Sequence, residues 1–91
     1  MAHTTDNKKD LILRLRRIKG QIEGIERALE REDGCATIMQ AVAASRGALN
    51  AVMVELIEGH LMEHVVNPKL SASERAAAGK EILAVVERYL K

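Results

Sequence analysis

The fold is decided by residues 11–29, which read LILRLRRIKGQIEGIERAL. Large aliphatic side chains recur in this stretch at alternating steps of four and three residues: Leu11, Leu15, Ile18, Ile22, Ile25 and Leu29. Steps of this size place side chains on one side of an α-helix, so the stretch predicts an amphipathic helix with a heptad stripe. Thr4, Thr5 or Asp6 can cap its start, and Arg31-Glu32-Asp33-Gly34 ends it.

A second helix is expected from about Cys35 to about His64. Its apolar stripe is followed by Pro68, which cannot continue a helix. A third helix is expected from Glu74 to Leu90, with Ser71 or Ser73 as its N-cap. The residues expected on the apolar side of the second helix are Ile38, Val42, Leu49, Val52 and Leu56, and those on the inner face of the third helix are Ile82, Leu83, Val86 and Leu90.

The composition supports an all-α fold. Of 91 residues, 47% are hydrophobic but only 1% are aromatic, which disfavours β-sandwiches and barrels and the aromatic platforms that stack single-stranded nucleic acid. No apolar run approaches the ~20 residues of a membrane span, and the N-terminus lacks the apolar core of a secretory signal. We therefore expect a single domain over residues 1–91, cytoplasmic and without membrane contact, whose one cysteine, Cys35, stays a free thiol.

The expected helices are too long for one short chain to cover. A helix of about 26 residues is about 39 Å long, whereas a compact chain of this length has a radius of gyration of ~12 Å. The apolar flanks of the expected protomer, an antiparallel helical hairpin plus a short C-terminal helix, would stay uncovered. Two antiparallel hairpins that dimerise into a four-helix bundle are the simplest solution.

Three histidines and the cysteine are the candidate metal ligands. His60 and His64 are four residues apart on one helix, so both imidazoles project from the same face. Cys35 lies 25 residues before His60, roughly 37 Å away along the same helix, so only an antiparallel neighbour brings its thiolate to the histidines. In an antiparallel hairpin the start of the first helix lies beside the end of the second, so His3 is expected near His60 and His64 of its own chain. This mixed donor set suits Ni(II), Co(II) or Zn(II) rather than Mg or Ca, with no organic cofactor.

A basic stretch at the start of the first helix is the second candidate site. Residues 8–19 contain six Lys or Arg, Arg16 and Lys19 among them, and one acid, for a local charge of +5. Arg14, Arg17 and Gln21 fall within about 60° of one another on a helical wheel. An oligomer repeats this patch symmetrically, and that is the electrostatic pattern of a protein that binds the DNA backbone.

Four segments make the chain similar to a known family. They are RLRRIKGQ at residues 14–21, Cys35, RGALN at residues 46–50 and GHLMEH at residues 59–64. With them the chain resembles the small all-helical repressors of the CsoR/RcnR/FrmR family, which sense copper, nickel and cobalt, or formaldehyde. The resemblance implies a homotetramer, built as a dimer of dimers, that represses efflux or detoxification genes on double-stranded operator DNA. The operator contacts that it implies are Arg14, Arg17, Gln21 and Arg46.

The resemblance is closest to the nickel/cobalt members. His3, Cys35, His60 and His64 match their ligand pattern, whereas the copper sensors carry cysteine where this chain has His64. We therefore predict a repressor of metal efflux genes that is released by Ni(II) or Co(II). The alternative is a formaldehyde-responsive repressor, in which one carbon joins the N-terminal amine to Cys35; those members have proline where this chain has Ala2.

Two functions of other classes are weaker alternatives. An enzyme could use the thiolate and imidazoles in nucleophilic catalysis, but the sequence has no evident oxyanion loop or substrate pocket. A metal chaperone would bind the ion and leave DNA alone.

Overall fold

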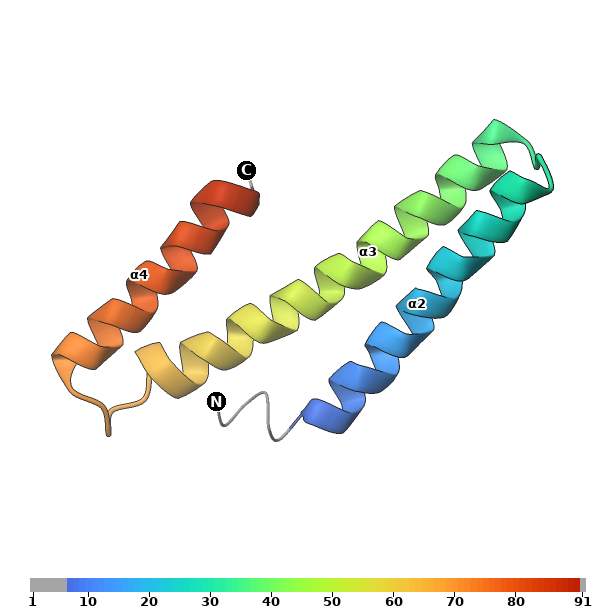
Figure 1. Ribbon diagram of the computed structural model, residues 1–91. Helices are drawn as coiled ribbons and strands as arrows, with labels where there is room; N and C mark the ends of the chain where they lie inside the picture. Colours follow the sequence, from blue (N-terminus) through green and yellow to red (C-terminus); the bar gives the residue numbers. More distant parts are fainter. Residues whose placement is uncertain (1–6, 91) are drawn as a thin grey trace. The chain divides into compact units, whose positions relative to one another are not determined.

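The structure is a computed structural model that describes residues 7–90. Its elements, in chain order, are the helices α2 (Lys8–Glu30) and α3 (Cys35–His60), a π-helical turn η1 (Leu61–Val65) and the helix α4 (Ala72–Tyr89) (Figure 1). Residues 7–90 contain no strand, so the predicted all-α fold of three helices is confirmed. The chain divides into two compact units, of which one spans residues 7–53 and the other contains residues 54–90. The expectation of a single domain over residues 1–91 stays a prediction.

The first unit is an antiparallel hairpin of α2 and the first part of α3 (Figure 1). Its turn is a Schellman motif: the Asp33 N–H donates to the Ala28 carbonyl at 3.0 Å and the Glu32 N–H to the Leu29 carbonyl at 3.1 Å. Glu32 takes the left-handed conformation, with φ 61°, at the position where glycine is usual. The turn therefore satisfies the last carbonyls of α2 but holds a side chain in a disfavoured backbone region.

The start of α2 carries no side-chain cap in the described residues. The helix begins at Lys8 behind Asn7, whose side chain accepts no capping hydrogen bond. The caps predicted from the sequence, Thr4, Thr5 and Asp6, lie outside the described residues.

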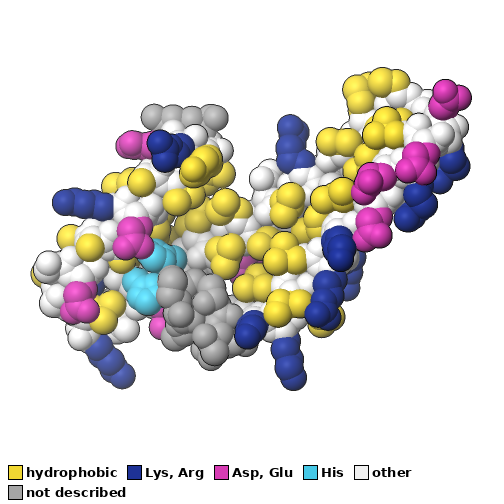
Figure 2. Space-filling view, in the orientation of Figure 1, with side chains coloured by type: hydrophobic (Ala, Val, Ile, Leu, Met, Phe, Trp, Pro, Cys, Tyr) yellow, Lys and Arg dark blue, Asp and Glu magenta, His cyan; other side chains and the backbone are white. Residues whose placement is uncertain are grey.

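Every second residue of the heptad stripe of α2 is buried or half-buried, and the residues between them are exposed. Leu11 and Ile18 are buried and Ile25 is half-buried, and these three residues follow one another at steps of seven. The alternate members are open to solvent, with exposed fractions of 44% for Leu15 and 46% for Ile22. Hydrophobic side chains are accordingly visible at the surface of α2 and α3 in Figure 2. One hairpin thus covers only half of the stripe that the sequence provides.

The second unit begins with the end of α3, where the helix changes type. The sequence predicted one helix to about His64, but α3 ends at His60 and the chain continues as the π-helical turn η1. Two side chains cover carbonyls of this turn: Asn67 Nδ2 donates to the Glu63 carbonyl at 3.3 Å, and Arg75 Nε donates to the Val65 carbonyl at 2.7 Å. These bonds supply partners for groups that a helix end leaves unsatisfied.

The helix α4 packs against η1 and begins with a capping box. The Glu74 N–H donates to Ser71 Oγ at 3.1 Å and the Ser71 N–H donates back to Glu74 Oε1 at 3.1 Å, so Ser71 is the cap and Ser73 is not. The hydrogen bond from the Ser71 backbone N–H stabilises the carboxylate and, together with the Ser71 side chain, holds the pKa of Glu74 below its ordinary value.

The inner face of α4 differs in part from the prediction. Ala78 is buried and Ile82 and Val86 are half-buried, but Leu83 is 59% exposed and Leu90 is 45% exposed. Leu83 is one residue, or about 100°, around the helix from Ile82, so it leaves the face that Ala78 and Ile82 share. No helix in the described part of the chain is long and apolar enough to cross a membrane.

The turn provides a test of this hairpin geometry. We expect Glu32→Gly to raise the free energy of unfolding by about 0.5–1 kcal/mol, because glycine removes the penalty of the left-handed conformation. Thermal unfolding at one fixed protein concentration measures the change. Glu32→Ala is the control, since it removes the charge but keeps the Cβ. A lower melting temperature for the glycine variant would contradict the assigned turn.

Candidate DNA groove and effector site

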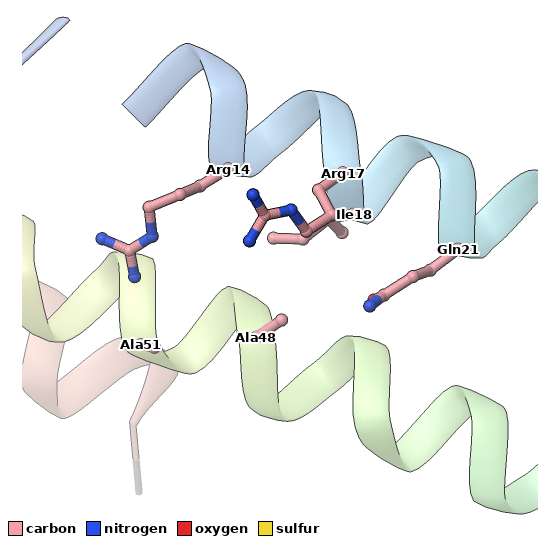
Figure 3. A pocket seen from close by; sticks show the side chains of 6 residues that line it. All are labelled: Arg14, Arg17, Ile18, Gln21, Ala48 and Ala51. Atoms are coloured by element: carbon pink, nitrogen blue, oxygen red, sulfur yellow. The ribbon is translucent and has the colours of Figure 1, made fainter. Parts of the chain in front are cut away.

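A basic groove runs between α2 and α3 within the hairpin unit. Arg14, Arg17 and Gln21 extend from α2 toward α3 (Figure 3). The groove is completed by Ile18 of α2 and by the small side chains of Ala48 and Ala51 of α3. Because alanine side chains are small, they leave space between the two helices for the three long polar side chains of α2. The helical wheel predicted that these three residues share one side, and the structure brings them together.

Two guanidinium groups give the groove its charge. The Arg14 side chain is 29% exposed and its Nη1 lies 3.8 Å from Asp10 Oδ2, one turn earlier on α2. At this distance and exposure an ion pair contributes little to stability. Arg17 is exposed. The groove therefore offers positive charge in a place where an anion can reach it.

Gln21 is held from the opposite helix. Ser45 Oγ of α3 donates a hydrogen bond to Gln21 Oε1 at 3.3 Å. Ser45 is 6% exposed and Gln21 is exposed, so this bond joins a buried residue of α3 to a surface residue of α2.

The other predicted DNA-binding residues lie outside this groove. Arg16 lines a separate shallow hollow with Lys9, Ile12 and Leu13. Lys19 and Arg46 are exposed and line neither hollow. Of the basic residues, Arg14 and Arg17 thus line the groove between α2 and α3, and the others lie outside it. The role of all six residues in DNA binding stays a prediction.

The two histidines of the second unit form a close pair. His60 is the last residue of α3 and His64 lies in η1, and their ring centroids are 5.0 Å apart with planes tilted by 53°. The His60 side chain is only 17% exposed, and the Nε2 atoms of both rings are buried. Figure 2 shows the histidine side chains gathered in one place beside α4. The sequence prediction that both imidazoles share one face agrees with this geometry.

A carboxylate that the sequence analysis did not select faces this pair. Glu81 Oε2 of α4 lies 3.5 Å from His60 Nε2. Glu81 also lines a hollow beside the two rings, to which α4 further contributes Glu74, Ala77 and Ala78. The signal was present in the sequence: Glu74 and Glu81 are seven residues apart, with three alanines between them, so one helix face carries both carboxylates.

The remaining predicted ligands are not at the histidine pair. Cys35 is exposed and opens the same 26-residue helix that His60 ends, about 37 Å away along the helix axis. His3 lies outside the described residues. Among residues 7–90, no three His, Cys, Asp or Glu side chains are grouped to hold a metal ion. The described residues thus bring two of the predicted ligands, His60 and His64, together, and the four-residue ligand set stays a prediction.

Known proteins resemble this chain over its full length. A model of the family "metal-sensitive transcriptional repressor" matches residues 7–88. The chain is 40% identical over 91 residues, all of both proteins, to an uncharacterized protein in the bioA 5′ region of Serratia marcescens. It is 37% identical over 91 residues, again all of both proteins, to the transcriptional repressor RcnR of Citrobacter koseri.

A solved structure extends the likeness to the fold. A glutamate-to-histidine variant of the formaldehyde-responsive regulator FrmR from Salmonella enterica serovar Typhimurium is 42% identical, with a TM-score of 0.83 over 92% of this chain and 94% of that one. The family implies operator binding and oligomerisation, which accords with the half-covered stripe of α2. The resemblance drawn from the motifs is thereby confirmed, and the chain belongs to the CsoR/RcnR/FrmR family of metal-sensitive transcriptional repressors.

Proposed function

We propose that this repressor binds operator DNA as a homotetramer and is released by Ni(II) or Co(II), so that metal efflux genes are expressed when these ions are abundant. The observation that carries the proposal is the histidine pair, whose rings are held 5.0 Å apart. Two imidazoles at a buried position are a donor set for first-row transition metals. The full-length similarity to RcnR supports the same class of effector.

Glu81 strengthens the case that His60 is a ligand. Metal-binding histidines usually place their second ring nitrogen against a carboxylate or carbonyl, which fixes the ring orientation and raises its basicity. Glu81 Oε2 lies 3.5 Å from His60 Nε2. In this role Glu81 orients the imidazole so that its other ring nitrogen binds the ion.

The other ligands come from the N-terminus and from a second subunit. We assign His3 of the same chain and Cys35 of the partner subunit, because Cys35 of the same chain is separated from His60 by the length of α3. The bound ion would supply coordination bonds that link the two subunits. A ligand set shared in this way makes the site sensitive to how the subunits are arranged.

The DNA side of the proposal rests on the groove. Arg14 and Arg17 point into it, and Arg16, Lys19 and Arg46 add exposed charge around it. Phosphate contacts of this kind set affinity and position a protein on the duplex. His3 lies just before α2, the helix that carries Arg14 and Arg17. Coordination by His3 would therefore favour a position of α2 that misaligns the arginines with phosphate, which is negative coupling between two sites.

A second candidate effector is formaldehyde. The Cys35 thiol is exposed and is the first residue of α3, so a small electrophile can reach its sulfur. A variant of the formaldehyde-responsive regulator FrmR resembles the chain in sequence and fold. In this alternative the N-terminal amine and Cys35 are joined through one carbon.

A parallel effector titration distinguishes the candidates. We expect Ni(II) and Co(II) to weaken operator affinity by about 10- to 100-fold, and Cys35→Ala and His64→Ala to abolish this response. Operator binding is measured with Ni(II), Co(II), Zn(II), Cu(I) and formaldehyde, and Met62→Ala, an exposed position in the same turn, is the control. Unchanged affinity with Ni(II) and Co(II) would refute the proposal, and release by formaldehyde alone would favour the alternative.

Subunit mixing tests the shared ligand set. A Cys35→Ala chain and a His60→Ala, His64→Ala chain each lack part of every site when alone. If the thiolate and the imidazoles come from different subunits, a mixed dimer regains one complete site. We therefore expect the Co(II)–thiolate absorption band, absent from each parent, to return in the mixture. Its absence from a mixture shown to contain hetero-oligomers would place the ligands in one chain.

Salt dependence tests the DNA groove. The Arg14→Ala, Arg17→Ala double variant should bind operator more weakly, and the slope of log affinity against log salt should fall by about 0.9 for each phosphate that the variant no longer neutralises. Arg88→Ala, an exposed arginine of α4, is the control that removes charge elsewhere. An unchanged slope would remove the groove from the interface. A wild-type protein that binds metal but no operator would instead be a metal chaperone.

A further inference from the structure

Ser45 is an unusual residue for its position in the hairpin. It is 6% exposed and is the one polar residue that is buried within residues 7–90. Buried Val52 follows it seven residues later on the same face of α3, and the Ser45 hydroxyl reaches Gln21 of α2. Alanine would pack at this place without a polar group to bury and is the better helix former. The hydroxyl is therefore not required to form the helix or its seam.

The hydroxyl has a partner in the groove. Ser45 Oγ donates to Gln21 Oε1 at 3.3 Å, a bond that crosses from α3 to α2. Gln21 itself is exposed and lines the groove with Arg14 and Arg17. A buried group thus holds the end of a flexible, solvent-accessible side chain.

The direction of this bond determines what Gln21 presents. A carboxamide has one oxygen, which accepts, and one NH2 group, which donates two hydrogens. Because the oxygen is engaged by Ser45, the NH2 group is left for the groove, which Gln21 lines together with Arg14 and Arg17. Phosphate oxygens only accept hydrogen bonds, so a carboxamide turned the other way would present an acceptor to an acceptor.

We propose that Ser45 is a positioning residue for DNA binding: it fixes the Gln21 carboxamide so that the NH2 group joins Arg14 and Arg17 as a donor to a backbone phosphate. The inference rests on the proposed function, because it requires the groove to receive DNA. Holding the side chain before binding removes part of the conformational entropy that would be lost when the phosphate binds. Ser45 itself touches no nucleotide.

A double-mutant cycle in operator binding tests this role. Affinity is measured for the wild type, Ser45→Ala, Gln21→Ala and the double variant over a series of salt concentrations. Ser45→Ala should weaken binding by about three- to tenfold, the effect of one neutral hydrogen bond, and should have no further effect when Gln21 is already alanine. Gln40→Ala, an exposed polar residue of α3, is the matched control and should leave affinity unchanged.

The salt dependence separates positioning from general damage to the groove. Neither Ser45 nor Gln21 is charged, so the slope of log affinity against log salt should equal that of the wild type in both single variants. Thermal unfolding of Ser45→Ala is recorded alongside and should match the wild type. A reduced slope, or an equal loss of affinity in the Gln21→Ala background, would show that Ser45 acts through the arginines or the packing and would overturn the inference.

The same data distinguish failure of the inference from failure of the proposed function. If Gln21→Ala binds operator like the wild type while the Arg14→Ala, Arg17→Ala variant does not, the groove binds DNA and the assignment of Gln21 and Ser45 is wrong. If neither variant changes operator affinity or its salt dependence, the groove is not the DNA-binding surface and the proposed function itself loses its DNA site.

Discussion

The constraint on which the structure depends is the heptad stripe of α2, of which one chain covers only half. Leu11 and Ile18 are buried and Ile25 is half-buried, whereas Leu15, Ile22 and Leu29 stay exposed. Burial of apolar surface is the main favourable term in folding and in association. A stripe that keeps three large aliphatic residues in water therefore favours a further surface to cover them, and oligomerisation is a property of the family.

The same hairpin explains why a groove can exist between two tightly paired helices. On the side of α3 that faces the arginines, the chain places Ala48 and Ala51, which are too small to fill the space beneath Arg14 and Arg17. Ile18, which also lines the groove, is buried, as are Ser45 and Val52 of α3. Large residues hold the helices together, and small ones keep the groove open for the long polar side chains of α2.

At the other end of α3 the geometry depends on a change of helix type. The π-helical turn carries His64, and its carbonyls are covered by Asn67 and Arg75. Arg75 belongs to α4, the helix that also brings Glu81 to His60. The capping box of Ser71 and Glu74 fixes where α4 begins. The π-helical turn, the histidine pair and α4 are therefore parts of one arrangement, and that arrangement is where we propose the effector site.

The three helices, the family and the candidate residues could be predicted from the sequence, because helix periodicity, capping and motif spacing are local properties. The sequence also placed Arg14, Arg17 and Gln21 on one side of α2, and His60 and His64 on one face, since residues three or four positions apart have a fixed angular relation on a helix. Three features appear only in the folded structure: which half of the stripe is buried, the position of Arg16, Lys19 and Arg46 outside the groove, and the change from α3 to a π-helical turn before His64. The fold also brought Glu81 to His60 and Ser45 to Gln21. Both pairs join residues that are far apart in the chain, and they depend on how one helix packs on another, which periodicity within a single helix does not specify.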